Sequence, residues 1–383
     1  MDRTHLAKLA ADLVAIPSVN PLEGPVGQDR GEKEIAHFVA SRLGEAGVEC
    51  ELRETIPDRP SVLARVPGQS EEAVWFDAHV DTVSPAGMAF DPFAARIEGD
   101  KLYGRGAADN KGSLAAMMAA LMALAQGGAK PPATVIFTAT ADEEYRMLGV
   151  LGLLRSGLRA RAAVVGEPTD LTVIIGHKGF ARFKVTTTGR AVHSSRPEAG
   201  VNAIYRMSGV IQALQTYADE VLPQDSLPLF GRRTLSVGVV RGGEYANVVP
   251  DFCEVEVDRR LLPGEDGTQA VAEVRAYLAS QLEGDLGLEV HDPHLMVAGY
   301  RVPSDHPFVQ AVAAAVTHVK GESCLQGMVA ATHAGPIAAA GIPVVVLGPG
   351  DVGEAHTAEE ALDLDSLEQS AAVYEALMRS GCQ

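Results

Sequence analysis

Short segments that are almost entirely apolar recur along the chain, and they limit the folds that it can adopt. Ala73–His79 and Thr134–Thr140 have the length of strands, and their lack of polar alternation indicates strands buried on both faces. Helical patterns such as Ser113–Ala125 alternate with these strands. The alternation predicts an α/β fold in which helices flank both faces of a mixed sheet. Two shorter strands of the same kind are predicted at Ala162–Val165 and Val344–Leu347.

A different pattern fills the middle of the chain. Beyond Lys178 the predicted strands lengthen, and Cys253–Arg259 alternates polar with apolar residues, which is typical of a sheet with one exposed face. The order strand, helix, strand, strand, helix, strand is that of a ferredoxin-like α+β unit. Its predicted elements are Phe180–Thr188, Val201–Ala218, Arg232–Val240, Cys253–Arg259, Thr268–Leu282 and Leu288–Leu295.

The α/β pattern returns after this segment. It ends in a helix that is predicted to begin at Asp365, with Glu368 completing a capping box. We therefore expect residues 179–295 to form a domain inserted into a first domain, which is made of residues 1–178 and 296–383.

The charge balance narrows the partners that the chain can have. Its 383 residues include 32 Lys and Arg against 50 Asp and Glu, a net charge of −18, which argues against nucleic acid or anionic membrane as a main partner. The longest apolar run, Leu114–Ala125, is shorter than the about 20 residues that span a membrane. The first residues lack the apolar core of a signal peptide, and the four cysteines are scattered, so we expect a cytoplasmic protein with reduced thiols.

Acidic and imidazole side chains gather where the apolar strands end. The run FDAHVDT contains His79 and Asp81, and residues two apart on a strand point the same way. Asp81 could therefore hold the far nitrogen of a metal-binding His79. A buried histidine bonded to a neighbour is the alternative interpretation.

Four further runs carry similar side chains. Asp109 lies in the loop GRGAADNKG, Glu143 and Glu144 in TATADEE, Glu167 in VVGEPTD and His356 in GPGDVGEAHTAEE. Any one of these runs could be an ordinary turn or a charged surface loop. Adjacent glutamates can also divide two tasks, since one can bind a metal while the other moves protons.

Taken together, the five runs supply two histidines and several carboxylates. This donor set suits a divalent ion such as Zn²⁺, Mn²⁺ or Co²⁺. The excess of carboxylates suggests two ions that share a bridging aspartate. The sequence thus predicts a dinuclear metal site at the strand ends of the α/β domain.

Six runs now point to a family. FDAHVDT, LYGRGAADNKG, TADEE, VVGEPT, ANVVPD and EAHTAEE resemble, in order, the signature blocks of the dinuclear-metal amidohydrolase and peptidase family. That family includes acetylornithine deacetylase, succinyl-diaminopimelate desuccinylase, the aminoacylases and the glutamate carboxypeptidases. The resemblance covers nearly the whole chain. It implies a zinc-exopeptidase-like catalytic domain with an inserted lid domain, which also forms a homodimer interface.

The resemblance assigns the metal ligands residue by residue. His79 and Glu167 would hold one ion, and Glu144 and His356 the other. Asp109 would bridge the two ions, which are expected to be zinc, with cobalt or manganese as alternatives. A cis peptide bond after Asp109 is also implied.

The resemblance assigns further roles as well. Glu143 would be the general acid and base, and Asp81 would orient His79. His193 would stabilise an oxyanion from across the dimer, while Asn247 and Arg259 would bind polar groups of the substrate. For Arg259 a solvated charged strand face is a live alternative. No metal role is predicted for the remaining histidines that lack such a block: His177, His291, His294 and His333.

These roles predict hydrolysis of an amide bond. The runs GHKG, HSSRPEAGVNAI and VLGPG resemble acetylornithine deacetylase more than the desuccinylase, which indicates a small N-acyl or N-acetyl basic amino acid as substrate. A glutamate carboxypeptidase, a dipeptidase acting on short peptides, and a succinyl-diaminopimelate desuccinylase are the alternatives. A non-catalytic metal-binding regulatory relative is a more distant one, and the retention of Glu143 argues against it.

Overall fold

The computed structural model describes residues 2–21, 31–282, 284 and 286–383. The chain divides into two compact units, which are described in turn. The first comprises Met1–Gly176, Val302–Gln326 and Thr332–Gln383, and the second comprises His177–Arg301 and Gly327–Ala331.

A mixed sheet forms the centre of the first unit, as predicted. Its strands follow the order β1-β2-β6-β3-β7-β18-β8. The central strand β3 runs parallel to both of its neighbours, β6 and β7. β2 pairs antiparallel with β6, β1 antiparallel with β2, and β8 antiparallel with β18. The strands are β1 (Glu49–Ile56), β2 (Arg59–Val66), β3 (Ser70–His79), β6 (Ala133–Thr140), β7 (Ala162–Val165), β8 (Val173–His177) and β18 (Val344–Val346).

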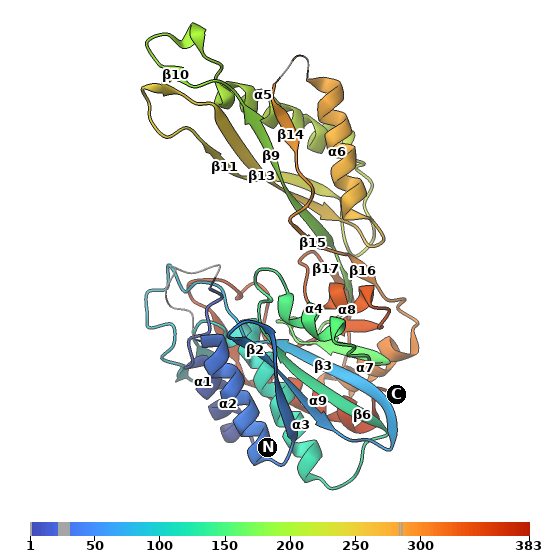
Figure 1. The fold of residues 1–383 in the computed structure, drawn as a ribbon. Coiled ribbons are helices and arrows are strands. Elements are labelled where there is room, and N and C mark those ends of the chain that lie inside the picture. Colours follow the sequence, from blue (N-terminus) through green and yellow to red (C-terminus); the bar gives the residue numbers. More distant parts are fainter. Residues whose placement is uncertain (1, 22–30, 283, 285) are drawn as a thin grey trace. The chain divides into compact units, whose positions relative to one another are not determined.

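Helices cover both faces of this sheet (Figure 1). On one face the buried helix α3 packs against α9 and α1, and α2 and α7 lie in the same layer. α9 also reaches the sheet, since the ring of Tyr374 contacts that of Phe76 in β3. On the opposite face α4 and α8 contact each other. The helices are α1 (Arg3–Val14), α2 (Gly31–Glu45), α3 (Gly112–Gln126), α4 (Leu148–Arg155), α7 (Pro307–Lys320), α8 (Ala334–Ala339) and α9 (Leu364–Ser380). None of the helices in the described ranges is long and apolar enough to cross a membrane.

The start of α9 corrects one expectation. Asp363 caps the helix, because its carboxylate accepts the backbone N–H groups of Asp365 and Ser366. The predicted capping box of Asp365 and Glu368 is therefore wrong. The Glu368 carboxylate instead lies 3.4 Å from the guanidinium of Arg3. A capping aspartate two residues earlier serves the same physical purpose of satisfying free N–H groups.

A small three-stranded sheet completes the first unit. It contains β4 (Arg96–Glu98), β5 (Lys101–Tyr103) and β19 (Ala361–Asp363), and β19 pairs antiparallel with β5. This pairing lays the segment that follows His356 alongside the segment that precedes Asp109. Two loops that are distant in sequence are thereby brought together.

The second unit has its own antiparallel sheet. Its order is β11-β13-β9-β14, and β15 also pairs with β9. The predicted single strand Leu288–Leu295 is instead two short strands, because Pro293 between them has no N–H to offer the ladder. The elements are β9 (Gly179–Thr188), α5 (Ala203–Thr216), β11 (Thr234–Gly242), β13 (Phe252–Leu261), α6 (Gly267–Gln281), β14 (Leu288–Val290) and β15 (Leu295–Val297). Shorter strands are β10 (Val192–His193) and β12 (Val248–Val249), which pair with each other, and β16 (Tyr300–Arg301). The strand β17 (Leu325–Met328) pairs with β8 of the mixed sheet.

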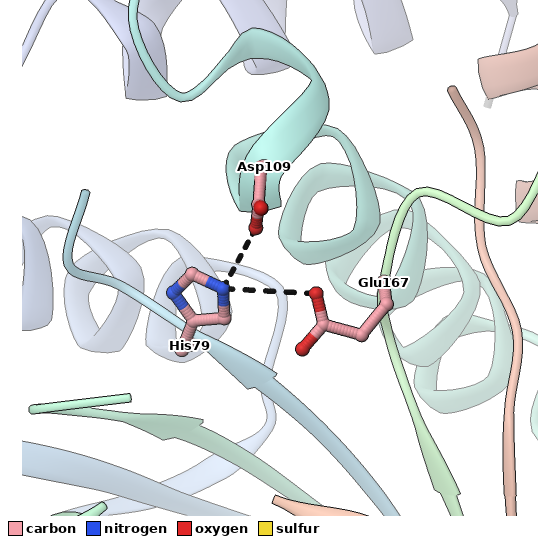
Figure 2. Close-up of side chains that lie close together, drawn as sticks. All are labelled: His79, Asp109 and Glu167. Carbon is pink, nitrogen blue, oxygen red and sulfur yellow. Dashed lines mark hydrogen bonds and ion pairs between the residues drawn. The ribbon is translucent and has the colours of Figure 1, made fainter. Parts of the chain in front are cut away.

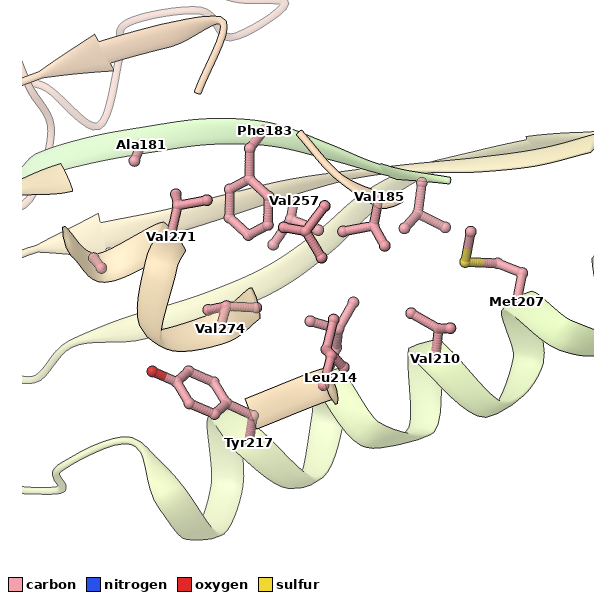
Figure 3. Packing of buried hydrophobic residues seen from close by; sticks show 14 of the residues in the cluster. Ala181, Phe183, Val185, Met207, Val210, Leu214, Tyr217, Val257, Val271 and Val274 are labelled. Atoms are coloured by element: carbon pink, nitrogen blue, oxygen red, sulfur yellow. The ribbon is translucent and has the colours of Figure 1, made fainter. Parts of the chain in front are cut away.

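Burial alternates along the strands of this sheet. Phe183 and Val257 face α5 and α6, where they pack against Val210, Leu214 and Val274 (Figure 3). The intervening residues form ion pairs on the other face, with Arg182 3.0 Å from Asp258 and Lys184 2.9 Å from Glu254. The polar alternation in Cys253–Arg259 predicted such a face correctly.

Candidate metal centre

The predicted ligands meet at one edge of the mixed sheet. His79 is the last residue of β3, Glu144 follows β6, and Glu167 follows β7. Because these strands are parallel, their carboxyl ends lie at the same edge, which is where α/β sheets carry their sites. Asp109 reaches this edge from the turn before α3, and His356 from the loop after β18.

A first group of ligands consists of His79, Asp109 and Glu167 (Figure 2). His79 Nε2 lies 3.0 Å from Asp109 Oδ1 and 3.9 Å from Glu167 Oε2. The side chains of His79 and Glu167 are buried, and their donor atoms lie within 4.8 Å of one another and of Asp109. One divalent ion can be held by three donors at such separations.

A second group consists of Asp109, Glu144 and His356. His356 Nε2 lies 3.2 Å from Glu144 Oε1 and 3.3 Å from Asp109 Oδ2. Asp109 thus directs one carboxylate oxygen towards each group, which is the arrangement that a bridging ligand needs. The peptide bond between Asp109 and Asn110 is cis, as the family resemblance implied.

Charge at this edge is unbalanced without cations. Burial raises the pKa of Glu143 and Glu167 well above the usual range and that of Glu144 to about 6. Hydrogen bonds that its ring donates to the carboxylates of Asp109 and Glu144 raise the pKa of His356 to about 11. Burial first, and then repulsion between neighbouring carboxylates, disfavours the fully ionised form of these glutamates. Two divalent ions would supply the missing positive charge, so these residues fit a dinuclear centre.

Asp81 supports the site in a way that differs from the expectation. His79 Nδ1 lies 2.9 Å from the main-chain oxygen of Asp81 and 3.5 Å from its carboxylate. A carbonyl only accepts, so Nδ1 carries the proton and Nε2 is left to bind a cation. The Asp81 carboxylate accepts the backbone N–H groups of Glu143 and Glu144, each at 3.0 Å. Asp81 therefore aligns both the histidine and the glutamate pair.

The two adjacent glutamates occupy different positions. Glu144 belongs to the second ligand group, whereas Glu143 belongs to neither group. The pKa of Glu143 is raised by burial and by the nearby carboxylates of Glu144 and Asp81, and His79 opposes the shift. A carboxyl group that retains a proton beside a metal site is suited to proton transfer.

Several supporting residues were missed by the sequence analysis. Arg59 forms ion pairs with Glu32 and, at 2.7 Å, with Asp142, which directly precedes the glutamate pair. Asn20 donates to Asp81 at 2.8 Å. No local pattern distinguishes a buried charge from a solvated one.

His333 is buried beside the first ligand group. Its Nδ1 lies 2.7 Å from the carboxylate of Asp77, and its ring centroid lies 6.4 Å from that of His79. Asp77 is two residues before His79 on β3, so the side chains of Asp77 and His79 point to the same face of the sheet. His333 therefore has a structural contact, in line with its lack of a motif.

His193 and Asn247 lie next to each other in the second unit. His193 in β10 pairs with Val248 in β12, and the main-chain oxygen of Asn247 accepts the N–H of Ser194 at 3.0 Å. Both side chains are exposed. His193 Nδ1 accepts the backbone N–H of Ser195 at 3.1 Å, so a neutral ring carries its proton on Nε2, ready to donate.

Arg259 has a different environment. Its side chain is only 2% exposed and lies on the helix-covered face of β13. The guanidinium donates to the main-chain oxygen of Arg260 and lies 3.9 Å from the carboxylate of Glu265. The alternative of a solvated charged face is therefore wrong for Arg259. A contact with substrate stays a prediction.

A mixed sheet with histidines and carboxylates at the ends of its parallel strands defines the class as an α/β protein with a candidate dinuclear metal site. The model of the peptidase family M20/M25/M40 matches residues 75–380, and the chain belongs to this family. Relatives include the acetylornithine deacetylase of Vibrio vulnificus, 32% identical over 369 residues that cover 92% of this chain and 93% of the relative. The acetylornithine deacetylase of Proteus mirabilis is 31% identical over 386 residues, with 98% and 96% covered.

Solved structures agree with the fold. An M20 family metallo-carboxypeptidase from Sulfolobus solfataricus superposes with a TM-score of 0.80 at 18% identity, and both chains are fully covered. A dinuclear metal-binding peptidase of the M20 family from Bacillus subtilis gives 0.70 at 19% identity, with 98% of this chain and 97% of that chain covered. Family and relatives together identify the protein as a metal-dependent amidohydrolase, which confirms the predicted family and enzyme class and goes against a non-catalytic relative.

Proposed function

We propose that the protein deacylates N-acyl amino acids, with an N-acetylated basic amino acid of the acetylornithine type as its preferred substrate. The observation that carries this proposal is the identity of about a third to acetylornithine deacetylases along more than nine-tenths of the chain. The two ligand groups that share Asp109 could hold the pair of metal ions that such a reaction requires.

The proposed cofactors are two divalent ions, with Zn²⁺ preferred and Co²⁺ or Mn²⁺ as alternatives. His79 and Glu167 would hold one ion, Glu144 and His356 the other, and Asp109 would bind both. When bound, such a pair of ions polarises the amide carbonyl and lowers the pKa of a water molecule towards neutrality. Imidazole and carboxylate donors in this ratio suit all three metals.

Glu143 is proposed to move the protons. Its carboxylate takes a proton from the attacking water and returns it to the nitrogen of the leaving amine. Burial and neighbouring carboxylates raise its pKa, and a raised pKa suits a group that must both accept and donate near neutral pH. Asp81 keeps the backbone of Glu143 in place through the hydrogen bond to its N–H.

A homodimer through the second unit is also proposed. β11 is the terminal strand of its sheet, and apolar side chains near its end are exposed, among them Val240, Tyr245 and Phe252. Such a patch on an edge strand is suited to pairing with another copy. His193 lies in the same unit, and its Nε2–H would donate to the oxyanion in the second subunit's site. Asn247 and Arg259 are the proposed contacts for polar substrate groups.

A substrate panel tests the proposed reaction. Release of free amine would be measured from N-acetylornithine, N-succinyl-diaminopimelate, an N-acylglutamate and several dipeptides, each with added Zn²⁺, Co²⁺ or Mn²⁺. The Glu143→Gln variant serves as the matched inactive control. Preference for N-acetylornithine supports the proposal. Preference for dipeptides or acylglutamates would replace it with the peptidase alternative, and preference for the succinyl substrate with the desuccinylase.

A further inference from the structure

Glu360 is a buried carboxylate that the proposed reaction does not use. It is the last residue of the run EAHTAEE, directly before β19, and its side chain is 0% exposed. An acidic side chain is almost never fully buried unless it has partners. The adjacent Glu359 is exposed, so the burial is specific to one of the two glutamates.

Both carboxylate oxygens of Glu360 have defined partners. Oε1 accepts the backbone N–H of Ala108 at 3.0 Å and that of Asp109 at 3.1 Å. Oε2 pairs with the guanidinium of Arg105, which is itself 2% exposed. In addition, the main-chain oxygen of Glu360 accepts the N–H of Gly104 at 3.2 Å. The turn that carries Asp109 is thus attached to Glu360 at several successive points.

These contacts join two loops of the second ligand group. Asp109 stands on one loop, and His356 precedes Glu360 on the other. The pairing of β19 with β5 brings the loops together, but it ends before either ligand is reached. Beyond the end of this strand pairing, the Glu360 carboxylate links the two loops by accepting the N–H of Asp109 itself. By contrast, the two ligands that belong only to the first group, His79 and Glu167, stand at the ends of β3 and β7, so of that group only the shared Asp109 stands on a loop that Glu360 holds.

A purely structural ion pair would not require this geometry. Arg105 alone could neutralise Glu360, yet Oε1 is turned towards the N–H groups beside the bridging aspartate. Burial raises the pKa of Glu360, and the negative charge of Asp109 adds to that effect, so the position is costly for an anion. Hydrogen-bonded residues that orient a metal ligand are a common part of metal sites, and Glu360 has the contacts that such a role needs.

We propose that Glu360 is a positioning residue that sets the spacing of Asp109 and His356, and hence the affinity of the second metal ion. This inference rests on the proposed function, since it takes the second ligand group to be a metal site. Arg105 neutralises Glu360 and has no direct part in the spacing. Glu360 acts through the backbone of Asp109 and touches no reacting atom.

The test compares two double variants that both lack the buried ion pair. Arg105→Met with Glu360→Gln keeps an oxygen that accepts the N–H groups of Ala108 and Asp109, whereas Arg105→Met with Glu360→Met removes it. Zinc stoichiometry and affinity would be measured by competition with a chromophoric chelator. Glu359→Gln serves as the exposed control. Folding would be followed by circular dichroism of the metal-free proteins.

The expected result is selective. The Gln variant and the exposed control should bind two zinc ions about as tightly as wild type. The Met variant should bind the second ion about 10- to 100-fold more weakly, the usual scale for residues that orient ligands, and the first ion much less affected. Equal binding of the second ion by the Gln and Met variants would overturn the inference.

One further variant covers the case in which the Met variant does not fold. Glu360→Asp keeps the charge beside Arg105 but draws the oxygen back from the N–H groups, so it should also weaken the second ion about tenfold or more. Unchanged zinc affinity in Glu360→Asp would overturn the inference as well. Wild-type protein that binds no zinc would instead overturn the proposed metal centre, and the two failures are therefore distinguishable.

Discussion

The two ligand groups of the metal centre are built differently. The first group stands on the sheet: His79 ends β3, its Nδ1 is bonded to Asp81, and it is 1% exposed. The second group depends on loops, and its histidine, His356, is 50% exposed with a φ of 62°. A ligand at the end of a buried strand is held by the core, whereas a ligand on a loop needs its own supports. We therefore expect the first ion to be bound more tightly than the second.

The largest effect is expected at the residue that the two groups share. Asp109→Ala removes a donor from both groups at once, so both ions should be lost and activity should fall to background. Metal analysis by mass spectrometry on the purified variant checks this. Two ions still bound to Asp109→Ala would contradict the bridging role.

Glu143→Gln should leave metal binding by both ligand groups unchanged but should abolish most of the hydrolytic activity. The amide keeps the size of the side chain but cannot accept the proton, so activity should fall by at least about a hundredfold. Both ions should remain, since Glu143 belongs to neither group. Steady-state rates and metal content would be measured on the same preparation. Intact activity would mean that the base lies elsewhere.

The difference between the two ligand groups can be tested by removing, from each group, one ligand that it does not share with the other. Glu167→Ala should weaken the first ion and Glu144→Ala the second, each by about 10- to 100-fold. If the sheet-borne group binds more tightly, Glu144→Ala should yield protein with one ion at limiting zinc, and that ion should resist chelator. Calorimetric titration with zinc resolves the two steps. Equal loss of both ions in either variant would show that the groups do not act separately.

Subunit mixing extends the comparison to the second unit. Glu143→Gln and His193→Ala homodimers should each be nearly inactive. After random exchange, half of the dimers are mixed, and each mixed dimer has one complete site if His193 serves the second subunit. Activity should therefore recover to about a quarter of wild type. If His193 served its own subunit, no mixed dimer would hold a complete site and mixing would restore nothing.

The smallest effect concerns the stability of the metal-free protein. Burial raises the pKa of Glu144 to about 6, and the pKa values of Glu143 and Glu167 are raised as well. Each of these groups contributes most stability below the usual glutamate pKa. The contribution of Glu144 is lost as the pH rises through about 6, and those of Glu143 and Glu167 are lost as the pH rises through their own raised pKa values. His356 acts in the same direction, because its contribution is complete below the usual histidine pKa and is lost as the pH rises through about 11.

The midpoint of unfolding in chelator should therefore be a few degrees lower at about pH 7.5 than at about pH 5. Zinc binds the deprotonated ligands, so the stabilisation by zinc should grow over the same range. Differential scanning calorimetry with and without zinc measures both trends. The Glu144→Gln variant should show a flatter dependence in chelator. A midpoint that rises with pH in the wild type would contradict the assigned shifts.

Much of the fold could be read from local periodicity. The apolar runs at Ala73–His79 and Thr134–Thr140 became central strands of the mixed sheet, and Ser113–Ala125 became its most buried helix. The ends of elements were less predictable. Leu288–Leu295 is broken in two, and Asp363 caps the last helix in place of Asp365, since caps and strand ends depend on which hydrogen-bond partners tertiary packing brings within reach.

The sequence by itself determined which residue types could form the metal site. His79, Asp109, Glu144, Glu167 and His356 each follow a pattern that is visible along the chain, and the family blocks assign them to two ions. Patterns of this kind are local, because the end of a strand and the turn after it are adjacent in sequence.

Only the tertiary structure decided how these residues are supported. It shows Asp81 binding His79 through a carbonyl and the glutamate pair through its carboxylate, Arg259 buried under two helices, and Glu360 bonded to the backbone of Asp109. Each of these contacts joins or buries residues through strand pairing and packing across the chain. A local pattern of residue types does not show which residues from distant parts of the chain will be in contact. The residues that support the site were therefore identified only in the folded protein.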